Sequence, residues 1–290
     1  MITVMKAEKT ELAELDDKLL EHAGEVLEEA LRLRDKGVSY RILMRRYKPS
    51  WERQVYLLLK KFLGNVSLLG KDSGLVGQRN TEWLCICDPL DGSLNFMCNL
   101  KYYAYSLALA RGGELVYAMV IDLEDMTYYR AEKGRGAYLG RPGKGLRSLK
   151  DEALKTPASY QVIANGVIIQ GMSSIELHCT ALELCYLARG VADLIVGHTW
   201  VPDMVAGYLI ARESGIMFVD WDFKPIKSLP LSYEEVKYIG GSPKSIAEFH
   251  SKVTSLRGVV FNETASHAVE LIHIGTSSSQ RPHPSHSQEL

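Results

Sequence analysis

The spacing of the hydrophobic residues changes near residue 64, and this change limits the fold classes open to the chain. Glu8 to Lys36 shows apolar residues at helical spacing and is followed by Gly37, a typical helix stop. Trp51 to Phe62 repeats the pattern and Gly64 ends it. From residue 83 onward the apolar residues follow the pattern of strands. We therefore expect helices followed by a sheet in the first half of the chain.

The later segments divide into a strand-rich part and an alternating part. Four strands joined by tight turns predict an antiparallel sheet: Trp83 to Cys87, Tyr103 to Arg111, Leu115 to Asp122 and Thr127 to Ala131. Beyond them strands and helices alternate. The predicted helices there are Ser174 to Arg189, Asp203 to Ser214 and Pro243 to Val253, and the predicted strands are Tyr160 to Ile169, Ala192 to Val196, Ile216 to Val219 and Tyr238 to Gly240.

These patterns predict an α/β chain, of the α+β kind, in two halves and a tail. Residues 1–150 form the N-terminal α+β half and residues 151–275 the C-terminal α/β half. A Gly-rich and charged stretch, Arg141 to Lys155, is the expected hinge between them. Residues 276–290 are almost free of apolar side chains, so we expect a flexible tail.

The composition limits the binding partners and the cellular compartment that we expect for the chain. Of the 290 residues, 34 are Lys or Arg and 35 are Asp or Glu, so the formal charge is -1 and there is no general attraction to nucleic acid or to an anionic membrane. No apolar run approaches the ~18 residues of a membrane span. The cysteines do not follow zinc-site spacing, and we expect buried free thiols in a reducing cytoplasm: Cys85, Cys87, Cys98, Cys179 and Cys185.

The segment from Asp88 to Phe96, Asp-Pro-Leu-Asp-Gly-Ser-Leu-Asn-Phe, carries the clearest chemistry. Asp88 and Asp91 follow a strand closely enough to hold one hard cation, and the Leu90 carbonyl is a third oxygen ligand. Gly92 permits a close approach of backbone to a ligand, and the amides from Gly92 onward would begin a helix that binds phosphate. The Ser93 hydroxyl would orient a metal-bound water. A simple solvated turn would explain each dipeptide, but not the whole segment.

This segment resembles the signature of the inositol monophosphatase family, the Mg²⁺-dependent, lithium-sensitive phosphatases of inositol and sugar phosphates. Three further blocks resemble the family in the same order: Glu132 to Leu139, Ala181 to Asp193, and Trp200 with Asp203 to Gly215. The resemblance implies a layered αβαβα sandwich, with an antiparallel N-terminal sheet and a mixed C-terminal sheet. It also implies that Asp88, Leu90, Asp91 and Asp203 hold metal, that Gly92 and Ser93 bind phosphate, and that Ser93 and Asp91 take part in catalysis.

The chain departs from the family at two acidic positions. Lys71 stands where the family has a glutamate that ligates the cation activating the water, and Asp72 follows it as a possible replacement. A cation ~4 Å from Mg²⁺ costs about 4 kcal/mol per unit of charge product at an effective dielectric near 20. Ser50 stands where the family motif has a further aspartate. We expect the Lys71 ammonium to reach Asp88 or Asp91.

Two functions remain open. The first is a Mg²⁺-dependent phosphatase that uses metal-activated water on a small phosphate monoester, such as inositol monophosphate, fructose 1,6-bisphosphate or a related sugar or nucleotide phosphate. The alternative is a weakened or inactive homologue that binds a phosphate ligand or has a structural role. The resemblance further implies a homodimer acting on a small phosphorylated metabolite. His198, near the end of a strand, is expected in a surface loop or at the groove.

Overall fold

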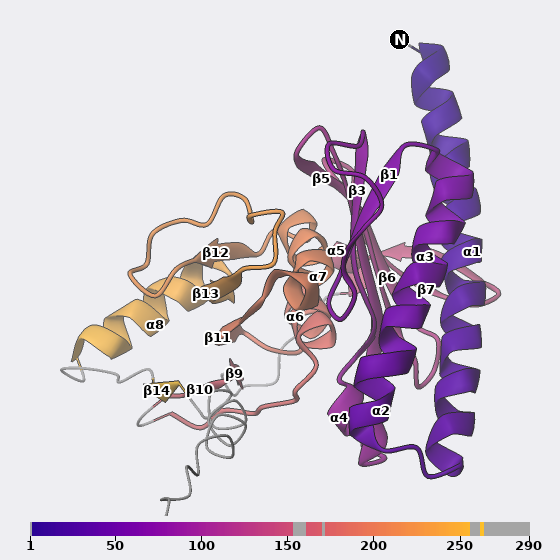
Figure 1. Cartoon of the computed structure of the whole chain (residues 1–290). Coiled ribbons are helices and arrows are strands. Elements are labelled where there is room, and N and C mark those ends of the chain that lie inside the picture. The colour runs from indigo at the N-terminus through magenta and orange to yellow at the C-terminus, as the bar shows by residue number, and fades with distance from the viewer. Residues whose placement is uncertain (1, 153–160, 170–171, 256–261, 264–290) are drawn as a thin grey trace, which may run out of the picture.

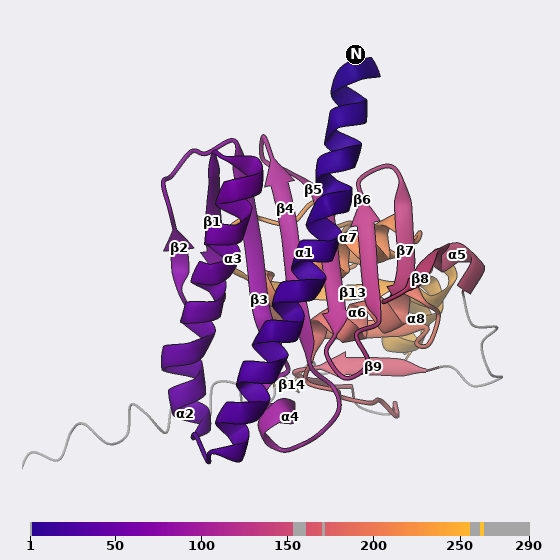
Figure 2. The same ribbon diagram turned by 90° about the vertical axis from the view of Figure 1, so that its right-hand side faces the viewer.

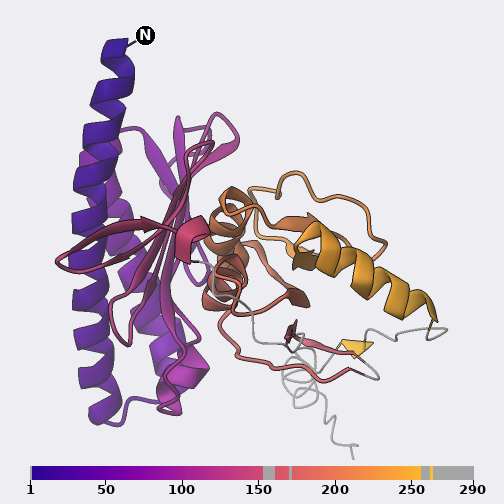
Figure 3. The ribbon, with the colours of Figure 1, turned by 180° about the vertical axis from the view of Figure 1, so that it is seen from behind.

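The computed structural model of the chain describes residues 2–152, 161–169, 172–255 and 262–263 and arranges them in five layers (Figure 1). A layer of long helices is followed by an eight-stranded sheet, two inner helices, a four-stranded sheet and an outer helix (Figure 3). The predicted αβαβα sandwich is confirmed. The predicted tail, residues 276–290, lies outside the described residues.

The first layer consists of α1 (Ile2–Asp35) and α3 (Lys48–Leu63), which cover one face of the large sheet (Figure 2). A short α2 (Tyr40–Ile42) and one π-helical stretch, η1 (Leu43–Tyr47), lead into α3. The apolar sides of α1 and α3 pack on the sheet in a core that includes Cys85 and Cys87. As expected, these two thiols share one face of their strand.

The large sheet has the strand order β2-β1-β3-β4-β5-β6-β7-β8. Its strands are β1 (Val66–Gly70), β2 (Gly74–Val76), β3 (Trp83–Asp91), β4 (Ala104–Arg111), β5 (Glu114–Asp122), β6 (Tyr128–Glu132), β7 (Gly136–Arg141) and β8 (Lys144–Ser148). Neighbouring strands are antiparallel, as predicted, except that β1 and β3 run parallel. The short α4 (Ser93–Met97) follows β3 directly.

Two inner helices, α6 (Thr180–Ala188) and α7 (Val201–Glu213), pack on the other face of the large sheet and form the largest core with it. Beyond them lies a mixed sheet in the order β12 (Met217–Val219), β13 (Glu235–Gly241), β11 (Leu194–Trp200) and β9 (Val162–Asn165), in which only β9 and β11 are parallel. The outer helix α8 (Pro243–Ser255) covers this sheet. A separate pair joins β10 (Val167–Ile168) to β14 (Asn262–Glu263).

Several predicted boundaries were wrong for tertiary reasons. The helix expected from Ser174 begins at Thr180, because the backbone of Ile175 forms a bridge with Ile163 and is held beside the small sheet. The expected hinge from Arg141 contains β8 and α5 (Leu149–Glu152) as far as it is described. None of the described helices is both long and apolar enough to cross a membrane.

Two single-residue predictions also need correction. Cys98 is exposed, whereas Cys85, Cys87, Cys179 and Cys185 are buried. His198 lies within β11 and is buried, neither in a surface loop nor free to face the groove. Its Nδ1 lies 2.6 Å from Glu235 Oε1 and its Nε2 lies 2.9 Å from the Gly166 carbonyl oxygen. Both ring nitrogens are therefore used in structure.

Candidate active site

A bulge in β3 sets the directions of Asp88 and Asp91. In a regular strand two residues three positions apart point to opposite faces. Here Asp88 pairs with Ser106 and Asp91 pairs with Ala104, so three steps along β3 match two steps along β4. The extra residue restores a common direction for the two carboxylates, and Pro89 is tolerated at such an irregularity because it needs no ladder hydrogen bond. The bulge therefore brings both aspartates to one side of the sheet.

Asp203 joins them from the second half of the chain. It lies in the first turn of α7, directly after β11, and its carboxylate is buried. One oxygen of each of the three carboxylates, Asp88, Asp91 and Asp203, lies within 4.8 Å of the others. The sequence thus placed the three aspartates together correctly. Their spacing can hold one cation with oxygen ligands.

Lys71 extends its ammonium group into this cluster, but its partner differs from the predicted one. It follows β1, and its Nζ donates a short hydrogen bond to Asp203 Oδ2. We expected Asp88 or Asp91, so that part of the prediction was wrong. The other oxygen of Asp203, Oδ1, is buried and accepts no hydrogen bond from any described residue. Among the described residues, Asp203 Oδ1 is therefore a carboxylate oxygen of the cluster that lacks a hydrogen-bond donor.

A second lysine, Lys48, lies on the opposite side of the cluster. Its Nζ is 3.0 Å from Asp88 Oδ1, 3.1 Å from Asp88 Oδ2 and 3.0 Å from Asp72 Oδ2, and its side chain is 2% exposed. Lys48 opens α3 immediately after the π-helical stretch. Ser50, which stands where the family has a further aspartate, is exposed. Lys48 was missed because Arg45, Arg46 and Lys48 stand close together and the sequence alone does not say which side chain turns inward.

The turn that carries Lys71 and Asp72 is fixed by Glu52. The carboxylate of Glu52 accepts hydrogen bonds from the amides of Asp72, at 2.8 Å, and Ser73, at 2.6 Å. Burial raises the pKa of Glu52 to about 7, opposed by these two amides and aided by the nearby aspartates. Glu52 is thus a positioning residue that sequence reasoning did not single out.

Asp91 is held by the start of α6 as well as by its own strand. Its Oδ2 accepts from the Ala181 amide at 2.9 Å and lies 3.4 Å from Cys179 Sγ, while its Oδ1 accepts from the Gly92 amide at 2.9 Å. Gly92 adopts φ +73°, and a Cβ there would lie 2.5 Å from the Tyr102 carbonyl oxygen. Only glycine fits this close approach. The Gly92 amide is paired, contrary to the expectation that it would be free.

Ser93 makes an unexpected contact. Its hydroxyl lies 3.4 Å from the sulfur of Met44, which belongs to the π-helical stretch. π-helical turns are rare and occur frequently at functional sites. Ser93 is 7% exposed, and its hydroxyl proton points to the Met44 sulfur. No sequence pattern indicated Met44.

The electrostatics of the cluster follow from burial and mutual repulsion. Burial, together with the carboxylates of Asp203 and Asp88, raises the pKa of Asp91 to about 7, and the Ala181 amide opposes these effects. Burial also raises the pKa of Asp203 and Asp72, against the effects of Lys71 and Lys48 respectively. With all four aspartates charged, the two lysines leave two negative charges. The cluster therefore favours a proton or one divalent cation.

A chain of buried polar groups leads from Asp203 to a further acid, Glu183 in α6. Thr199, Thr180 and Asn165 lie between them, with successive contacts of 3.4, 3.4, 2.7 and 2.8 Å. Burial raises the pKa of Glu183 to about 8, with the Asp91 charge adding to the effect. The sequence offered a weak signal, because Glu183 is the one acid in an otherwise apolar helix.

Comparisons with known proteins agree with this geometry. The model of the inositol monophosphatase family matches residues 8–256. A fructose-1,6-bisphosphatase/inositol-1-monophosphatase of Thermococcus kodakarensis is 29% identical over 170 residues, which cover 57% of this chain and 65% of that protein. A Nus factor SuhB of Vibrio cholerae is 28% identical over 167 residues, covering 53% of this chain and 62% of that protein. The matched part thus spans less than two thirds of either relative.

Solved structures share the fold over more of the chain. Inositol monophosphatase II of Staphylococcus aureus superposes with a TM-score of 0.66 at 18% identity, covering 92% of this chain and 99% of that one. SuhB of Mycobacterium tuberculosis gives a TM-score of 0.62 at 22% identity, covering 85% and 97%. These likenesses establish the fold, and the family match extends over most of the sequence. The chain belongs to the inositol monophosphatase family.

Proposed function

We propose that this chain binds small phosphate monoesters with the help of a single Mg²⁺ ion and hydrolyses them slowly. The observation that carries the proposal is the pair of lysines inside the acidic cluster, Lys71 on Asp203 and Lys48 between Asp88 and Asp72. The family acts as phosphatases, and the three aspartates support retention of that chemistry. The two lysines support a reduced cation content.

The residues present fit one divalent cation. Three carboxylates converge, the buried Asp203 Oδ1 has no hydrogen bond among the described residues, and one divalent charge would balance the cluster. The side chains of Asp88, Asp91 and Asp203 would hold the ion, with the Leu90 carbonyl as a further oxygen ligand. When bound, the ion supplies charge neutralisation for the phosphate and a more acidic water.

A second cation does not fit the residues present. The family's position for a ligating glutamate carries the Lys71 ammonium, and Asp72 is occupied by Lys48 at 3.0 Å. An ammonium ~4 Å from a second Mg²⁺ would cost about 8 kcal/mol at an effective dielectric near 20, because the ion carries two charges. Asp72 therefore does not take over the role of the missing glutamate. This loss is the reason to expect slow hydrolysis.

Residues of the chain itself would bind the phosphate and hold the loop in position. The amide and the hydroxyl of Ser93 would receive phosphate oxygens, and the hydroxyl would exchange its contact with the Met44 sulfur for the ligand. Asp91 would keep the loop in place through its bonds to Ala181 and Gly92, and it would lose its proton when the cation binds. A small phosphorylated metabolite as substrate, a homodimer and a cytoplasmic location complete the proposal.

A specific observation favours a second candidate, a homologue that binds phosphate ligands without turnover. Lys71 replaces an acidic residue of the family, and a second lysine, Lys48, also enters the cluster; both ammonium groups pair with carboxylates that would otherwise face cations. One relative is named a Nus factor and not a phosphatase. In this candidate the cluster is retained for binding and for stability.

Phosphate release from a panel of sugar, polyol and nucleotide monoesters, with and without Mg²⁺, tests the proposal. We expect slow release that requires Mg²⁺ and disappears in Asp203→Asn, while the matched surface control Asp222→Asn keeps it. Phosphate binding without release would favour the second candidate. Calorimetry measures the binding of phosphate. If phosphate does not bind in the presence of Mg²⁺, both candidate functions are wrong.

A further inference from the structure

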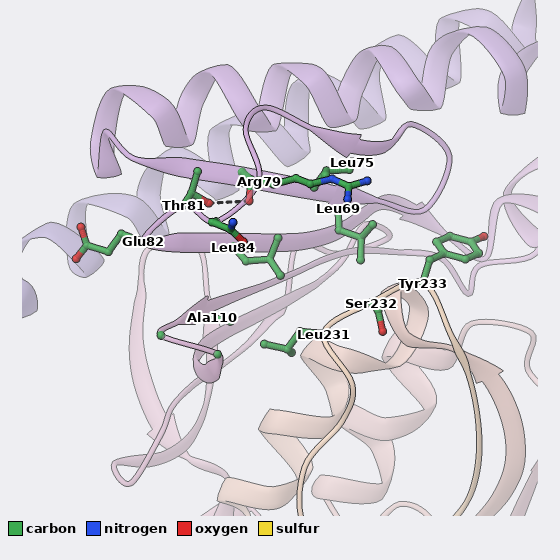
Figure 4. Close-up of a pocket in the computed structure, with 14 residues that line it drawn as sticks. Leu69, Leu75, Arg79, Thr81, Glu82, Leu84, Ala110, Leu231, Ser232 and Tyr233 are labelled. Carbon is green, nitrogen blue, oxygen red and sulfur yellow. Dashed lines mark hydrogen bonds between the residues drawn. The ribbon is translucent and has the colours of Figure 1, made fainter.

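A cavity of about 760 Å³ lies between the edge of the large sheet and the loop that precedes β13 (Figure 4). Leu69 and Leu84 project into it from neighbouring strands, and Leu231 faces them from the loop. Leu75 and Ala110 add further apolar surface to its lining. Arg79, Asn80, Thr81 and Glu82 also line the cavity, so the leucines form an apolar part, suited to an apolar group, in a lining that is polar elsewhere.

This cavity and the carboxylate cluster follow one another on the same face of the sheet. Leu84, Ile86 and Asp88 alternate along β3, so Leu84 and Asp88 share a face and lie roughly 13 Å apart at the rise of a strand. On the parallel neighbour β1, Leu69 pairs with Ile86 and Lys71 follows two positions later. The wall of the cavity at Leu69 is therefore two strand positions from Lys71 of the cluster.

Tyr233 lies at the border between the two regions. It lines the cavity (Figure 4), and burial raises the pKa of its hydroxyl while Lys71 lowers it and Asp203 raises it. Its ring lies 4.9 Å from the ring of Trp200, three residues before Asp203. Both rings are substantially exposed, at 42% and 41%. Exposed aromatic faces of this kind provide a surface for stacking a flat group.

We infer that this cavity receives the aromatic body of the phosphate monoester whose phosphate lies at the carboxylate cluster. The inference rests on the proposed function for the position of the phosphate and names the substrate class: esters of an alcohol that carries a flat, largely apolar group. A polyol would leave its hydroxyls without partners against Leu69, Leu84 and Leu231. The aromatic ring would instead bury its surface there and against Tyr233.

Two phosphonates that resist hydrolysis test the inference in the presence of Mg²⁺. Naphthylmethylphosphonate carries the flat body, and methylphosphonate lacks it. Calorimetry on the whole chain should show roughly tenfold or greater preference for the naphthyl compound. Leu231→Gln, which places an amide in the cavity, should bring the two affinities together. The matched control Leu146→Gln changes an exposed leucine of β8 and should keep the preference.

The outcomes separate the two proposals. If inorganic phosphate and methylphosphonate do not bind in Mg²⁺, the proposed function is wrong. If methylphosphonate binds and the wild-type chain shows no preference for the naphthyl compound, the cavity assignment is wrong whatever the variants do. A preference that survives in a folded Leu231→Gln variant would also overturn it, because the ring would then lie elsewhere.

Discussion

The ammonium group of Lys71 is bonded to Asp203, a residue 132 positions later in the chain, and it leaves the buried Oδ1 of that carboxylate without a hydrogen bond among the described residues. This contact joins the end of β1 to the start of α7. It also places a fixed positive charge where other members of the family are expected to have an acidic ligand. The behaviour of Lys71 is therefore the most direct measure of what the site has lost.

Lys71→Glu should restore an acidic ligand beside Asp203. We expect the number of tightly bound Mg²⁺ ions to rise from one to two and phosphate release to increase by about tenfold or more. Metal stoichiometry from calorimetry and initial rates of phosphate release measure these effects. Lys71→Met is the control, since it removes the charge without adding a ligand. An unchanged stoichiometry in folded Lys71→Glu would assign the second-ion loss to another residue.

Lys48→Met should destabilise the chain strongly. The change leaves Asp88 and Asp72 buried without their ammonium partner, and removal of one member of a buried pair typically costs about 3–5 kcal/mol. Urea unfolding in EDTA measures the loss. Added Mg²⁺ should recover part of it, because a cation can then balance the same carboxylates. Lys61→Met, at an exposed position of α3, should have little effect, and equal stability of the two variants would contradict the prediction.

Gly92→Ala and Gly112→Ala separate two effects of added side chains. Both glycines have positive φ, +73° and +60°, but only Gly92 has an atom in the way, the Tyr102 carbonyl oxygen at 2.5 Å. The backbone strain alone should cost Gly112→Ala roughly 1–2 kcal/mol. Gly92→Ala should cost more and should weaken phosphate binding. Similar unfolding free energies for the two variants would show that the loop around Gly92 yields easily.

Glu183 should make the stability of the chain depend on pH. Its pKa is raised from 4.5 to about 8 in the folded state, so the folded state holds a proton that the unfolded chain gives up. Stability should therefore be highest below the unfolded pKa, near 4.5, and should fall as the pH rises toward 8.

The matching variant is Glu183→Gln, which keeps an uncharged group at this place. Its unfolding free energy should decline less than that of the wild type between about pH 5 and about pH 8, by about 2 kcal/mol or more. Glu28→Gln, at an exposed position of α1, serves as the control. Parallel declines in the wild type and in Glu183→Gln would assign the dependence to other buried acids, such as Glu52.

The parts of the site that sequence could predict are those fixed by the local chain. Asp88, Asp91 and Gly92 belong to one short segment whose conformation is set by its own proline, glycine and bulge. Asp203 was found because Trp200 and the segment from Asp203 to Gly215 resemble a block of the family, and Asp203 lies at the start of a helix. In both cases the short side chains leave little freedom once the backbone is placed.

The parts that could not be predicted depend on long side chains and distant neighbours. A lysine side chain can reach several partners, so the choice of Asp203 by Lys71 is decided only by the position of α7. Lys48 and Met44 turn inward because of a π-helical stretch that no sequence pattern announced. The late start of α6 has a similar cause, since a bridge between Ile175 and Ile163 holds the preceding residues in an extended form.

The bulge between Asp88 and Asp91 has a consequence for changes in chain length. Deleting one residue would restore regular pairing with β4 and would leave the two aspartates two positions apart, on the same face of the strand. Inserting one residue beside the existing bulge would match four steps along β3 to three along β4 and would turn one carboxylate toward the α1 and α3 side of the sheet. Substitutions at other places in the site can alter its charge one residue at a time. Between these two aspartates, however, a single inserted residue would dismantle the cluster in one step.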